Sequence, residues 1–377
     1  MPLERLIEQP RARRVIECMV RENRLPHALL FWGPQGVGKS AAAIELARWL
    51  NCDRELEGPC GACDSCIRFR ALEHPHFSYQ MPLPGKALVD SEGGELTQAG
   101  AALLADILKA KGEDPYRPAD FPGGQFILIG QIRFLVQWAS KRAFIDKPRL
   151  ALIDGADRLR EEAGNALLKL LEEPPANFIL VLTAETPEDL LPTLQSRCHS
   201  VEFDRLRPEV IERELRARGF DEERSIRRIA HLCGGNFTRA LEFVAQPERA
   251  TQLHNLAINL VRHALSKSPL ELDHLLETWV KLGPTDQRLT LEIIATWMRD
   301  AAVIQAIEGT GEAEVINVDH RDLLKKFVAN CPRADFTSAT EQVEEARRNL
   351  EGNALPPLTL LSLARHLYCD IYQHKPV

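Results

Sequence analysis

The sequence predicts an α/β domain, in which helices cover both faces of a parallel sheet, followed by an all-helical region. Up to about residue 203, short apolar runs alternate with segments of helical period, as in parallel α/β domains. A glycine-rich loop follows the first apolar run and opens a helix. From about residue 204 onward, the strong segments all have helical spacing.

Each apolar run in the first region has the length of a buried parallel strand, and each is followed by a helical segment or a turn. Strands are expected at residues 28–32, 150–153, 178–182 and 200–203, with a further run of uncertain type at 126–129. Helices are expected at 39–51, 132–143 and 161–173. Pro174 and Pro175 stop the last of these helices, because proline cannot continue the backbone hydrogen-bond ladder.

Residues 81–124 interrupt this alternation with an irregular stretch that contains five prolines, several glycines and one helical piece at 101–111. The stretch is too long for an ordinary connector between a strand and a helix. We interpret it as an insertion on the surface of the first domain.

The second region divides into a small helical domain and a longer one. Helices at 208–219, 222–233 and 238–244 make up the small domain, with a Gly-Gly-Asn break before the last. Beyond it, Ile293, Trp297 and Ile304 illustrate the helical spacing of the remainder. The predicted domains are therefore 1–203, 204–247 and 248–377.

Composition excludes several classes of protein. The 377 residues are 45% hydrophobic and 27% charged, which is typical of a globular protein with two or three domains. A net charge of -7 argues against a generally basic protein that coats nucleic acid. No apolar run approaches the roughly 18 residues of a membrane helix, and the first residues lack a signal-peptide core. We therefore expect a cytoplasmic protein with no membrane partner.

The glycine-rich loop, Gly33-Pro-Gln-Gly36-Val-Gly38-Lys39-Ser40, has the pattern of a phosphate cradle. Its glycines allow backbone N–H groups to turn toward phosphate oxygens at a helix N-terminus. Lys39 would neutralise phosphate charge, and Ser40 would ligate Mg²⁺. The alternative is a strand-turn-helix that matches by chance.

Asp154 ends the strand expected at 150–153, so its carboxylate would lie at the sheet edge beside the phosphates and hold magnesium. A helix N-cap is the alternative role. The next residue is Gly155, where many ATPases of this kind have a water-activating glutamate. The helical spacing of Asp157 aims it elsewhere. The chain is thus equipped to hold a nucleoside triphosphate with Mg²⁺ but poorly equipped to cleave it.

Four of the nine cysteines are clustered: Cys52, Cys60, Cys63 and Cys66. Four thiolates within fifteen residues, two pairs of them in Cys-x2-Cys spacing, suit tetrahedral Zn²⁺. A redox pair would leave two cysteines unexplained, and an iron–sulfur cluster would lack an obvious electron partner. We predict a closed structural zinc site, because no ligand position remains for water.

These motifs, taken together, resemble a known family. The string Asn165-Ala-Leu-Leu-Lys-Leu-Leu-Glu-Glu-Pro-Pro175, the triplet Ser196-Arg197-Cys198 and the cysteine cluster resemble the AAA+ clamp-loader ATPases of bacterial DNA polymerase III. The resemblance implies an AAA+ P-loop domain with an inserted zinc module at 52–66, a helical lid and a C-terminal collar for oligomerisation.

Departures from the motor pattern indicate which branch of the family the chain resembles. Besides Gly155, the sensor position after the strand expected at 178–182 counts to Glu185, or with less support to Thr183. The lid arginine position counts to Thr238, with Arg239 one residue late. Three weakened positions resemble the delta-prime branch, which does not turn over ATP, although many of its members lose the phosphate loop that this chain keeps.

The resemblance also implies partners and one catalytic residue. Clamp loaders are five-subunit rings in which motor subunits (gamma/tau) and a delta subunit help load the sliding clamp onto primed DNA. Arg197 would be an arginine finger that stabilises γ-phosphate charge in a neighbouring motor subunit. The local alternative is a structural ion pair with Glu185 or Glu188.

Two other functions remain open. An active gamma/tau-like motor ATPase would need a substitute base, for which Asp157 and Glu185 are the candidates. A P-loop kinase of small molecules would need an acceptor pocket and lid arginines, which the zinc cluster and the helical second half do not supply.

Overall fold

The computed structural model describes residues 3–54, 58–84, 97–119, 121, 126–141, 147–265, 269–307, 315–317, 320–351 and 354–372. The insertion residues 85–96, 120 and 122–125 and the module residues 55–57 lie outside this set. The chain forms two compact units: Met1–Gly219 with Cys233–Leu241, and Phe220–Leu232 with Glu242–Val377. The division at 203 and 247 stays a prediction.

The first unit is built on a five-stranded sheet with the order β2-β3-β4-β1-β5, in which every pair of neighbours is parallel. Its strands are β1 (Ala28–Trp32), β2 (Phe77–Gln80), β3 (Arg149–Ile153), β4 (Phe178–Ala184) and β5 (His199–Glu202). The loop of Gly33–Ser40 leaves β1 in the middle of the sheet, between β4 and β5. A central position at the carboxyl edge is where ligands of open parallel sheets bind.

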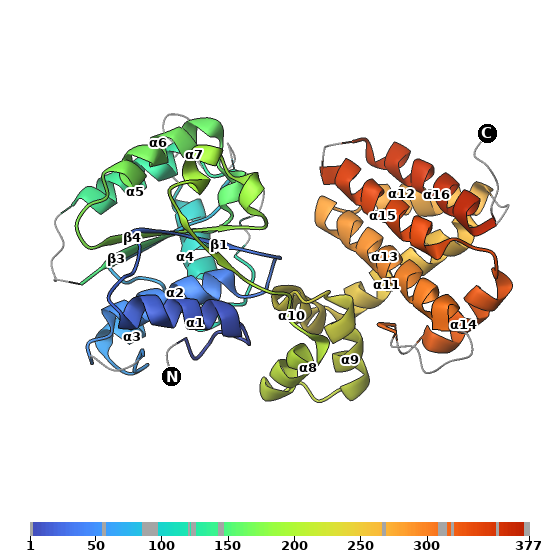
Figure 1. The fold of residues 1–377 in the computed structure, drawn as a ribbon, viewed down its shortest axis with the longest axis horizontal. Coiled ribbons are helices and arrows are strands. Elements are labelled where there is room, and N and C mark those ends of the chain that lie inside the picture. Colours follow the sequence, from blue (N-terminus) through green and yellow to red (C-terminus); the bar gives the residue numbers. More distant parts are fainter. Residues whose placement is uncertain are drawn as a thin grey trace. The chain divides into compact units, whose positions relative to one another are not determined.

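Helices cover both faces of the sheet, as predicted (Figure 1). One face carries α1 (Pro10–Arg21), α2 (Lys39–Asn51) and α4 (Gln98–Glu113); the other carries α5 (Ile129–Ser140), α6 (Glu161–Glu172) and α7 (Pro192–Gln195). The strand period of two sends alternate residues to the two cores. Leu29 and Phe31 of β1 face the first core, and Ala28 and Leu30 face the second.

The structure decides the run of uncertain type and adds one strand that the sequence analysis missed. The apolar run 126–129 is not a strand: Phe126 and Ile127 form isolated bridges, and α5 begins at Ile129. The missing strand is β2, which pairs with β3 at the sheet edge. Its sequence, Phe-Ser-Tyr-Gln, alternates apolar and polar residues, yet all four are buried, and Gln80 Nε2 donates to Ser78 Oγ at 3.0 Å.

The described part of 81–124, which we interpreted as a surface insertion, packs on the first core. Helix α4 lies against the first core through partly buried leucines and Ile107, and Met81, Leu83 and Phe121 are buried in that core. Tyr116 is fully buried. The helical piece expected at 101–111 is confirmed as part of α4, whose end lies against the backbone that follows α3.

The remaining helices that the structure describes follow in chain order. They are α3 (Asp64–Arg68), α8 (Pro208–Ala217), α9 (Glu223–Leu232), α10 (Phe237–Ala245), α11 (Pro247–Ala264), α12 (Pro269–Val280), α13 (Pro284–Ile307), α14 (Arg321–Asn330), α15 (Phe336–Glu351) and α16 (Pro356–Tyr372). Two single-turn 3₁₀ helices follow β3 and β4: η1 (Ala156–Arg158) and η2 (Pro187–Asp189).

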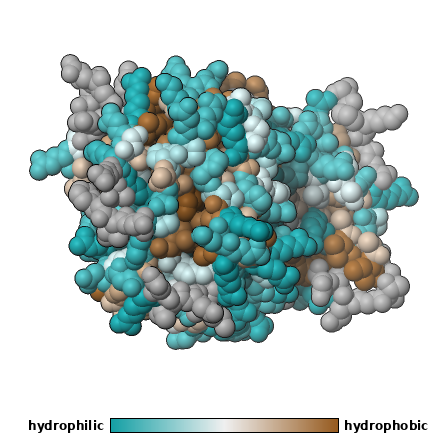
Figure 2. Space-filling view, turned by 60° about the vertical axis from the view of Figure 1, so that its left-hand side comes forward, coloured by the Kyte–Doolittle hydropathy of each residue, from teal (hydrophilic) through white to brown (hydrophobic). Residues whose placement is uncertain are grey.

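The described residues of the second unit form helices joined by turns, with no strand among them, and α13 forms its centre. The buried Asp300 carboxylate accepts hydrogen bonds from the backbone N–H groups of Ile316 and Asn317 at 3.0 and 2.7 Å, so it fixes the segment before α14. Among the described residues, no helix has both the length and the apolar character that a membrane span requires. Figure 2 shows one face of the molecule, on which hydrophilic residues dominate and apolar residues form smaller areas.

Candidate functional site

The loop of Gly33–Ser40 has the backbone of a phosphate cradle. Gly33, Gly36 and Gly38 have φ angles of 138°, 67° and 110°, which residues with a side chain rarely adopt. A Cβ on Gly33 would lie 2.2 Å from the carbonyl oxygen of Phe203, so the close approach of β5 also requires glycine. The sequence thus forms the predicted nest of N–H groups at the N-terminus of α2.

Lys39 is turned back onto its own loop. Its ammonium donates to the carbonyl oxygens of Gly33 and Pro34, the second at 2.6 Å. Burial lowers the pKa of Lys39, while the nearby carboxylates Asp154, Glu185 and Asp157 act in the opposite direction. An arriving phosphate would exchange two carbonyl partners for a charged one, which forms stronger hydrogen bonds.

Asp154 lies where the sequence predicted it, beside the loop. Its carboxylate accepts from the hydroxyl groups of Ser40 and Thr183, each at 2.7 Å, and from that of Tyr79. Burial alone would raise the pKa of Asp154, but the Lys111 ammonium and the three hydroxyl donors outweigh it and lower that pKa. The residue is therefore a carboxylate next to Ser40, and an oxygen pair of this kind suits Mg²⁺.

Gly155 forms the turn that follows β3, so this position itself carries no carboxylate. Its φ of 83° places it in the left-handed region, and its N–H donates to Thr183 Oγ1 at 2.9 Å. Two residues on, burial raises the pKa of Asp157, and Arg158 acts against this shift. The Asp157 carboxylate lies beside Gly155, 3.9 Å from where a Cβ on that glycine would be.

The two candidate sensor residues occupy different places. Thr183 lies within β4, and its hydroxyl bridges Asp154 and the Gly155 N–H. Glu185 lies just beyond β4 and accepts from Gln35 Nε2 of the loop. Sequence counting favoured Glu185. The register of the parallel strands, which pairs Ile153 with Leu182, would have pointed to Thr183 instead.

The start of α10 packs directly on the phosphate loop. The Phe237 N–H donates to the Gly36 carbonyl at 3.0 Å, and a Cβ on Gly36 would lie 1.7 Å from Asn236 Oδ1. Asn236 also caps this helix by accepting from the Arg239 N–H at 2.9 Å. The two residues counted as the lid position, Thr238 and Arg239, are both partly buried in the first turn of α10.

Arg197 follows α7 and is partly exposed, with 38% of its side chain accessible. Its guanidinium donates to Glu172 Oε1 and to the Thr193 carbonyl, both at 3.0 Å. An ion pair is therefore present, but with Glu172 of α6 rather than with Glu185 or Glu188. Exposed pairs of this kind contribute about 0–1 kcal/mol, so a phosphate would displace Glu172 at little cost.

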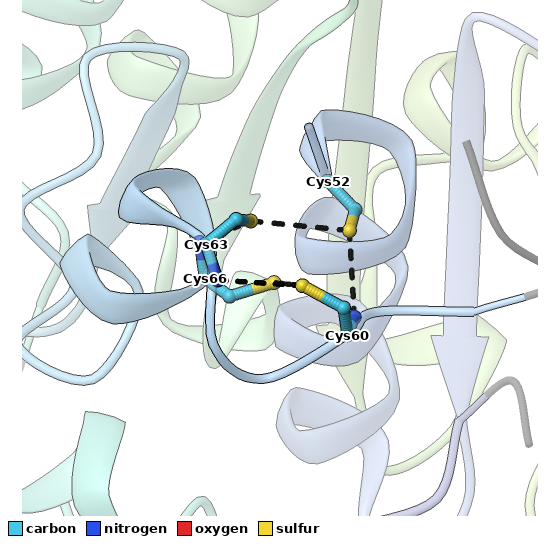
Figure 3. A group of neighbouring side chains, drawn as sticks. All are labelled: Cys52, Cys60, Cys63 and Cys66. Carbon is cyan, nitrogen blue, oxygen red and sulfur yellow. Dashed lines mark hydrogen bonds between the residues drawn. The ribbon is translucent and has the colours of Figure 1, made fainter. Parts of the chain in front are cut away.

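The four clustered cysteines converge as predicted (Figure 3). Cys52 follows α2, while Cys63 and Cys66 belong to α3 or its cap, and their sulfurs and that of Cys60 all lie within 4.8 Å of one another. The pairs Cys52–Cys63 and Cys60–Cys66 are both 4.0 Å apart. Four sulfurs around one tetrahedral zinc would lie about 3.8 Å apart, because each Zn–S bond is about 2.3 Å long. The cluster could hold a metal ion of this size.

The surroundings of the cluster favour the thiolate form of some of the four cysteines but not of others. Backbone N–H groups of Ala62 and Cys63 lower the pKa of Cys60 to about 6, whereas burial raises that of Cys66 to about 12. Four thiolates this close repel one another, and a divalent cation removes that repulsion. Lys147 fixes the module by donating to the carbonyls of Asn51 and Cys52 at 3.1 and 2.9 Å.

Comparison with known proteins decides the family. The profile of the family described as "DNA polymerase III, delta subunit" matches residues 8–207. The chain belongs to this DNA polymerase III delta subunit family. A second profile, for the C-terminal part of the delta subunit, matches residues 247–364. The resemblance that the motifs predicted is confirmed, and with it the P-loop fold and the helical C-terminal half.

Members of the DNA polymerase III family match most of the chain. The delta' subunit of Bacillus subtilis is 27% identical over 350 residues, which cover 92% of each protein. The gamma/tau subunit of Mycobacterium bovis is 26% identical over 366 residues, covering 89% of this chain and 56% of that protein. A gamma subunit-related protein from Thermotoga maritima, 16% identical and covering 94% of this chain and 99% of that one, superposes with a TM-score of 0.35, too low to carry an argument.

Proposed function

We propose that the chain is a delta-prime-type subunit of a clamp loader, which holds a nucleotide without hydrolysing it and donates Arg197 to a neighbouring motor subunit. The presence of Gly155 is the single observation that carries the proposal that the nucleotide is not hydrolysed. A general base must lie within hydrogen-bond reach of the attacking water, and the residue after Asp154 has no side chain to do so.

The nucleotide in this proposal rests on the cradle of Gly33, Gly36 and Gly38. Lys39 would pair with phosphate oxygens, and Ser40 with Asp154 would hold the magnesium shell. The 2.7 Å contact between Ser40 Oγ and Asp154 Oδ1 supports this role, because both oxygens face one point beside the loop. The partners we propose are gamma/tau and delta subunits, the sliding clamp and primed DNA in the assembled ring.

The exposure of Arg197 and its weak local ion pair support the proposal that it acts on a neighbouring motor subunit. A guanidinium that must reach another subunit's γ-phosphate has to leave its own partner, and exposed ion pairs are readily exchanged. Arginine fingers contribute on the order of 10³–10⁵ in rate in other phosphoryl-transfer systems. Within a ring with several sites, loss of one finger would remove only the share of turnover from the site that it serves.

The experiment reconstitutes the loader with gamma/tau and delta subunits and measures DNA-dependent ATP hydrolysis and clamp loading. Arg197→Ala is expected to lower both rates while leaving assembly intact. The matched control is Arg216→Ala, which removes an arginine of similar exposure, 42%, that pairs with Glu212 on α8. Equal rates in the Arg197 variant and the control would remove the finger role from Arg197.

The absence of turnover has its own measurement on the isolated chain. We expect binding of Mg²⁺–nucleotide to be lost in Lys39→Ala and no steady release of phosphate from the wild type. Robust hydrolysis that disappears in Lys39→Ala would instead support the motor ATPase. In that case Asp157, whose carboxylate lies beside Gly155, would be the first base to test.

For the cysteine cluster we propose structural zinc. The sulfur geometry and the lack of any fifth ligand among the described neighbours support a closed site. Metal analysis of the purified chain should give one zinc per protein, and Cys66→Ser should lower that content. A folded wild-type chain without zinc would contradict the proposal.

A further inference from the structure

Tyr116, from the insertion, is wedged against the last glycine of the phosphate loop. A Cβ on Gly38 would lie 2.4 Å from the Tyr116 oxygen. That oxygen accepts a hydrogen bond from the Ile7 N–H at 2.9 Å, and the ring meets Phe237 edge-on at 5.3 Å between centroids. The N-terminal segment, the loop and the start of α10 therefore close around one buried aromatic ring.

A cavity lies on the other side of this ring. It measures about 710 Å³, opens to solvent and is lined mostly by charged residues around Leu6, Ile7 and Tyr116, and no residue of the phosphate loop lines it. Ligand pockets typically have about 300–1,000 Å³, so the cavity has room for a nucleoside. Tyr116 stands between this space and Gly38.

The position of Tyr116 matters because the phosphates and the nucleoside of a nucleotide are covalently joined and bind side by side. Its phosphates would lie on the loop and at the N-terminus of α2, with the metal at Ser40 and Asp154. Its sugar and base follow the α-phosphate and must leave the cradle beside the loop. At Gly38 they would meet the Tyr116 ring, which is packed too closely to admit a further group.

The segment that carries the ring is held in place. Asp114 forms an ion pair with Arg218, and the Lys111 ammonium donates to the Arg117 carbonyl at 2.9 Å. Arg5 adds two hydrogen bonds to the Gly112 carbonyl at 3.1 and 3.0 Å. Withdrawing Tyr116 would break contacts on both sides of it, so the ring imposes a free-energy cost on any ligand that needs its place.

We propose that Tyr116 is a specificity-determining residue that fills the place of the nucleoside, so that the loop takes an inorganic triphosphate as well as it takes a nucleoside triphosphate. The inference rests on the proposed phosphate-binding role of the loop, and it assigns a role to the insertion. The ligand class of the site as built is a polyphosphate anion with Mg²⁺. Removing the ring would join the cavity to the cradle and restore selectivity for the nucleotide.

The test titrates the full-length chain with Mg²⁺–ATP and with magnesium tripolyphosphate by calorimetry. In the wild type tripolyphosphate should bind at least as tightly as ATP, because the nucleoside gains no place of its own. In Tyr116→Ala, ATP should bind at least tenfold more tightly than before, while tripolyphosphate binding stays the same. Tyr116→Phe, which keeps the ring and loses only the acceptor for Ile7, should retain the wild-type ratio.

Phe121→Ala is the structural control, because Phe121 is a buried aromatic residue of the same insertion outside the phosphate loop. It should leave the ratio of the two affinities unchanged. Arg218→Ala, which frees Asp114 and keeps the ring, should move the ratio in the same direction as Tyr116→Ala by a smaller factor. This variant keeps the test decisive if Tyr116→Ala does not fold.

The following results would overturn the proposal. They are a wild-type chain that already prefers ATP tenfold, a ratio that no variant changes, and a parallel loss of both affinities in Tyr116→Ala. A chain that binds neither ligand in any variant also overturns it. None of these results bears on Arg197, whose role is decided in the reconstituted loader.

Discussion

At the scale of single residues, the candidate site depends on contacts that cross the sheet edge. The Asp154 carboxylate is partly buried, and its hydroxyl partners Ser40, Tyr79 and Thr183 come from α2, β2 and β4. Gly155 then turns the chain away with a positive φ, where an active enzyme of this kind would have a glutamate. The position that has the left-handed backbone conformation is thus the same position that has no side chain to act as a base.

Gly155→Ala should destabilise the chain by about 1–2 kcal/mol, because the left-handed conformation penalises a Cβ by that amount. The space itself is open, since a Cβ there meets nothing closer than 3.7 Å. Urea unfolding of the isolated chain measures the change. Gly155→Asn is the matched variant: asparagine tolerates this conformation, so it should cost less than alanine. An equal cost for both would show that crowding, not φ, requires glycine.

At the scale of elements, α4 and the cysteine module are joined by a contact that only glycine permits. A Cβ on Gly112 would lie 2.3 Å from the Arg70 carbonyl oxygen and 2.9 Å from that of Phe69. Both atoms belong to the backbone that follows α3 and cannot swing aside. The end of the insertion helix is therefore fixed to the module that the four cysteines would organise around a metal.

Gly112→Ala should cost about 1–3 kcal/mol, because the overpacked backbone has to shift. Denaturant unfolding of the full chain measures it. Gly283→Ala is the control, since no atom lies within 4 Å of its Cβ position. An alanine there is expected to be nearly neutral. Similar costs for the two variants would argue against the packing explanation.

His74 should make the module sensitive to acid. Burial, with a smaller effect from His76, lowers the pKa of His74 to about 4. Because the unfolded chain accepts the proton first, near pH 6.5, the stability contributed by neutral His74 is present above pH 6.5 and is lost as pH falls toward 4. In urea unfolding between pH 7.5 and 4.5, His74→Gln should lose less stability than the wild type.

Metal release at low pH affects the wild type and this variant alike, so the difference between them isolates His74. His199→Gln, which changes an exposed histidine of β5, is the control and should follow the wild-type curve. If His74→Gln follows that curve as well, neutral His74 contributes nothing over this pH range.

At the scale of the whole molecule, apolar side chains remain exposed on the last helix. Leu358 and Leu361 of α16 expose 62% and 47% of their surface, and Leu355 just before it exposes 65%. Clusters of exposed leucines are uncommon on isolated proteins and mark contact surfaces. This agrees with the proposed collar, in which sister subunits cover such surfaces.

Leu358→Glu should therefore weaken assembly with gamma/tau and delta subunits without changing the stability of the isolated chain. Size-exclusion chromatography of the reconstituted mixture measures assembly, and thermal unfolding measures stability. Val15→Glu on α1, which also changes an exposed apolar residue, serves as the control. Assembly of the Leu358 variant at the wild-type level would exclude this face from the ring contacts.

The sequence by itself determined the parts whose chemistry is local. The glycines of the loop Gly33–Ser40 lie within six residues, the four cysteines lie within fifteen residues, and three of the five strands are short apolar runs. Each of these signals is complete within one segment of chain. Family resemblance then followed from contiguous motifs, and the comparisons confirmed it.

Only the tertiary structure decided what distant segments do together. Strand β2 is half polar, so its burial depends on β3 and on side-chain partners that no local period reveals. Thr183 joins the Asp154 cluster through the register of β3 and β4. Tyr116 reaches Gly38 from more than seventy residues along the chain, through a segment whose prolines and glycines indicated a surface loop. Long-range packing decides such contacts, because their free energy comes from burial that exists only once the fold is complete.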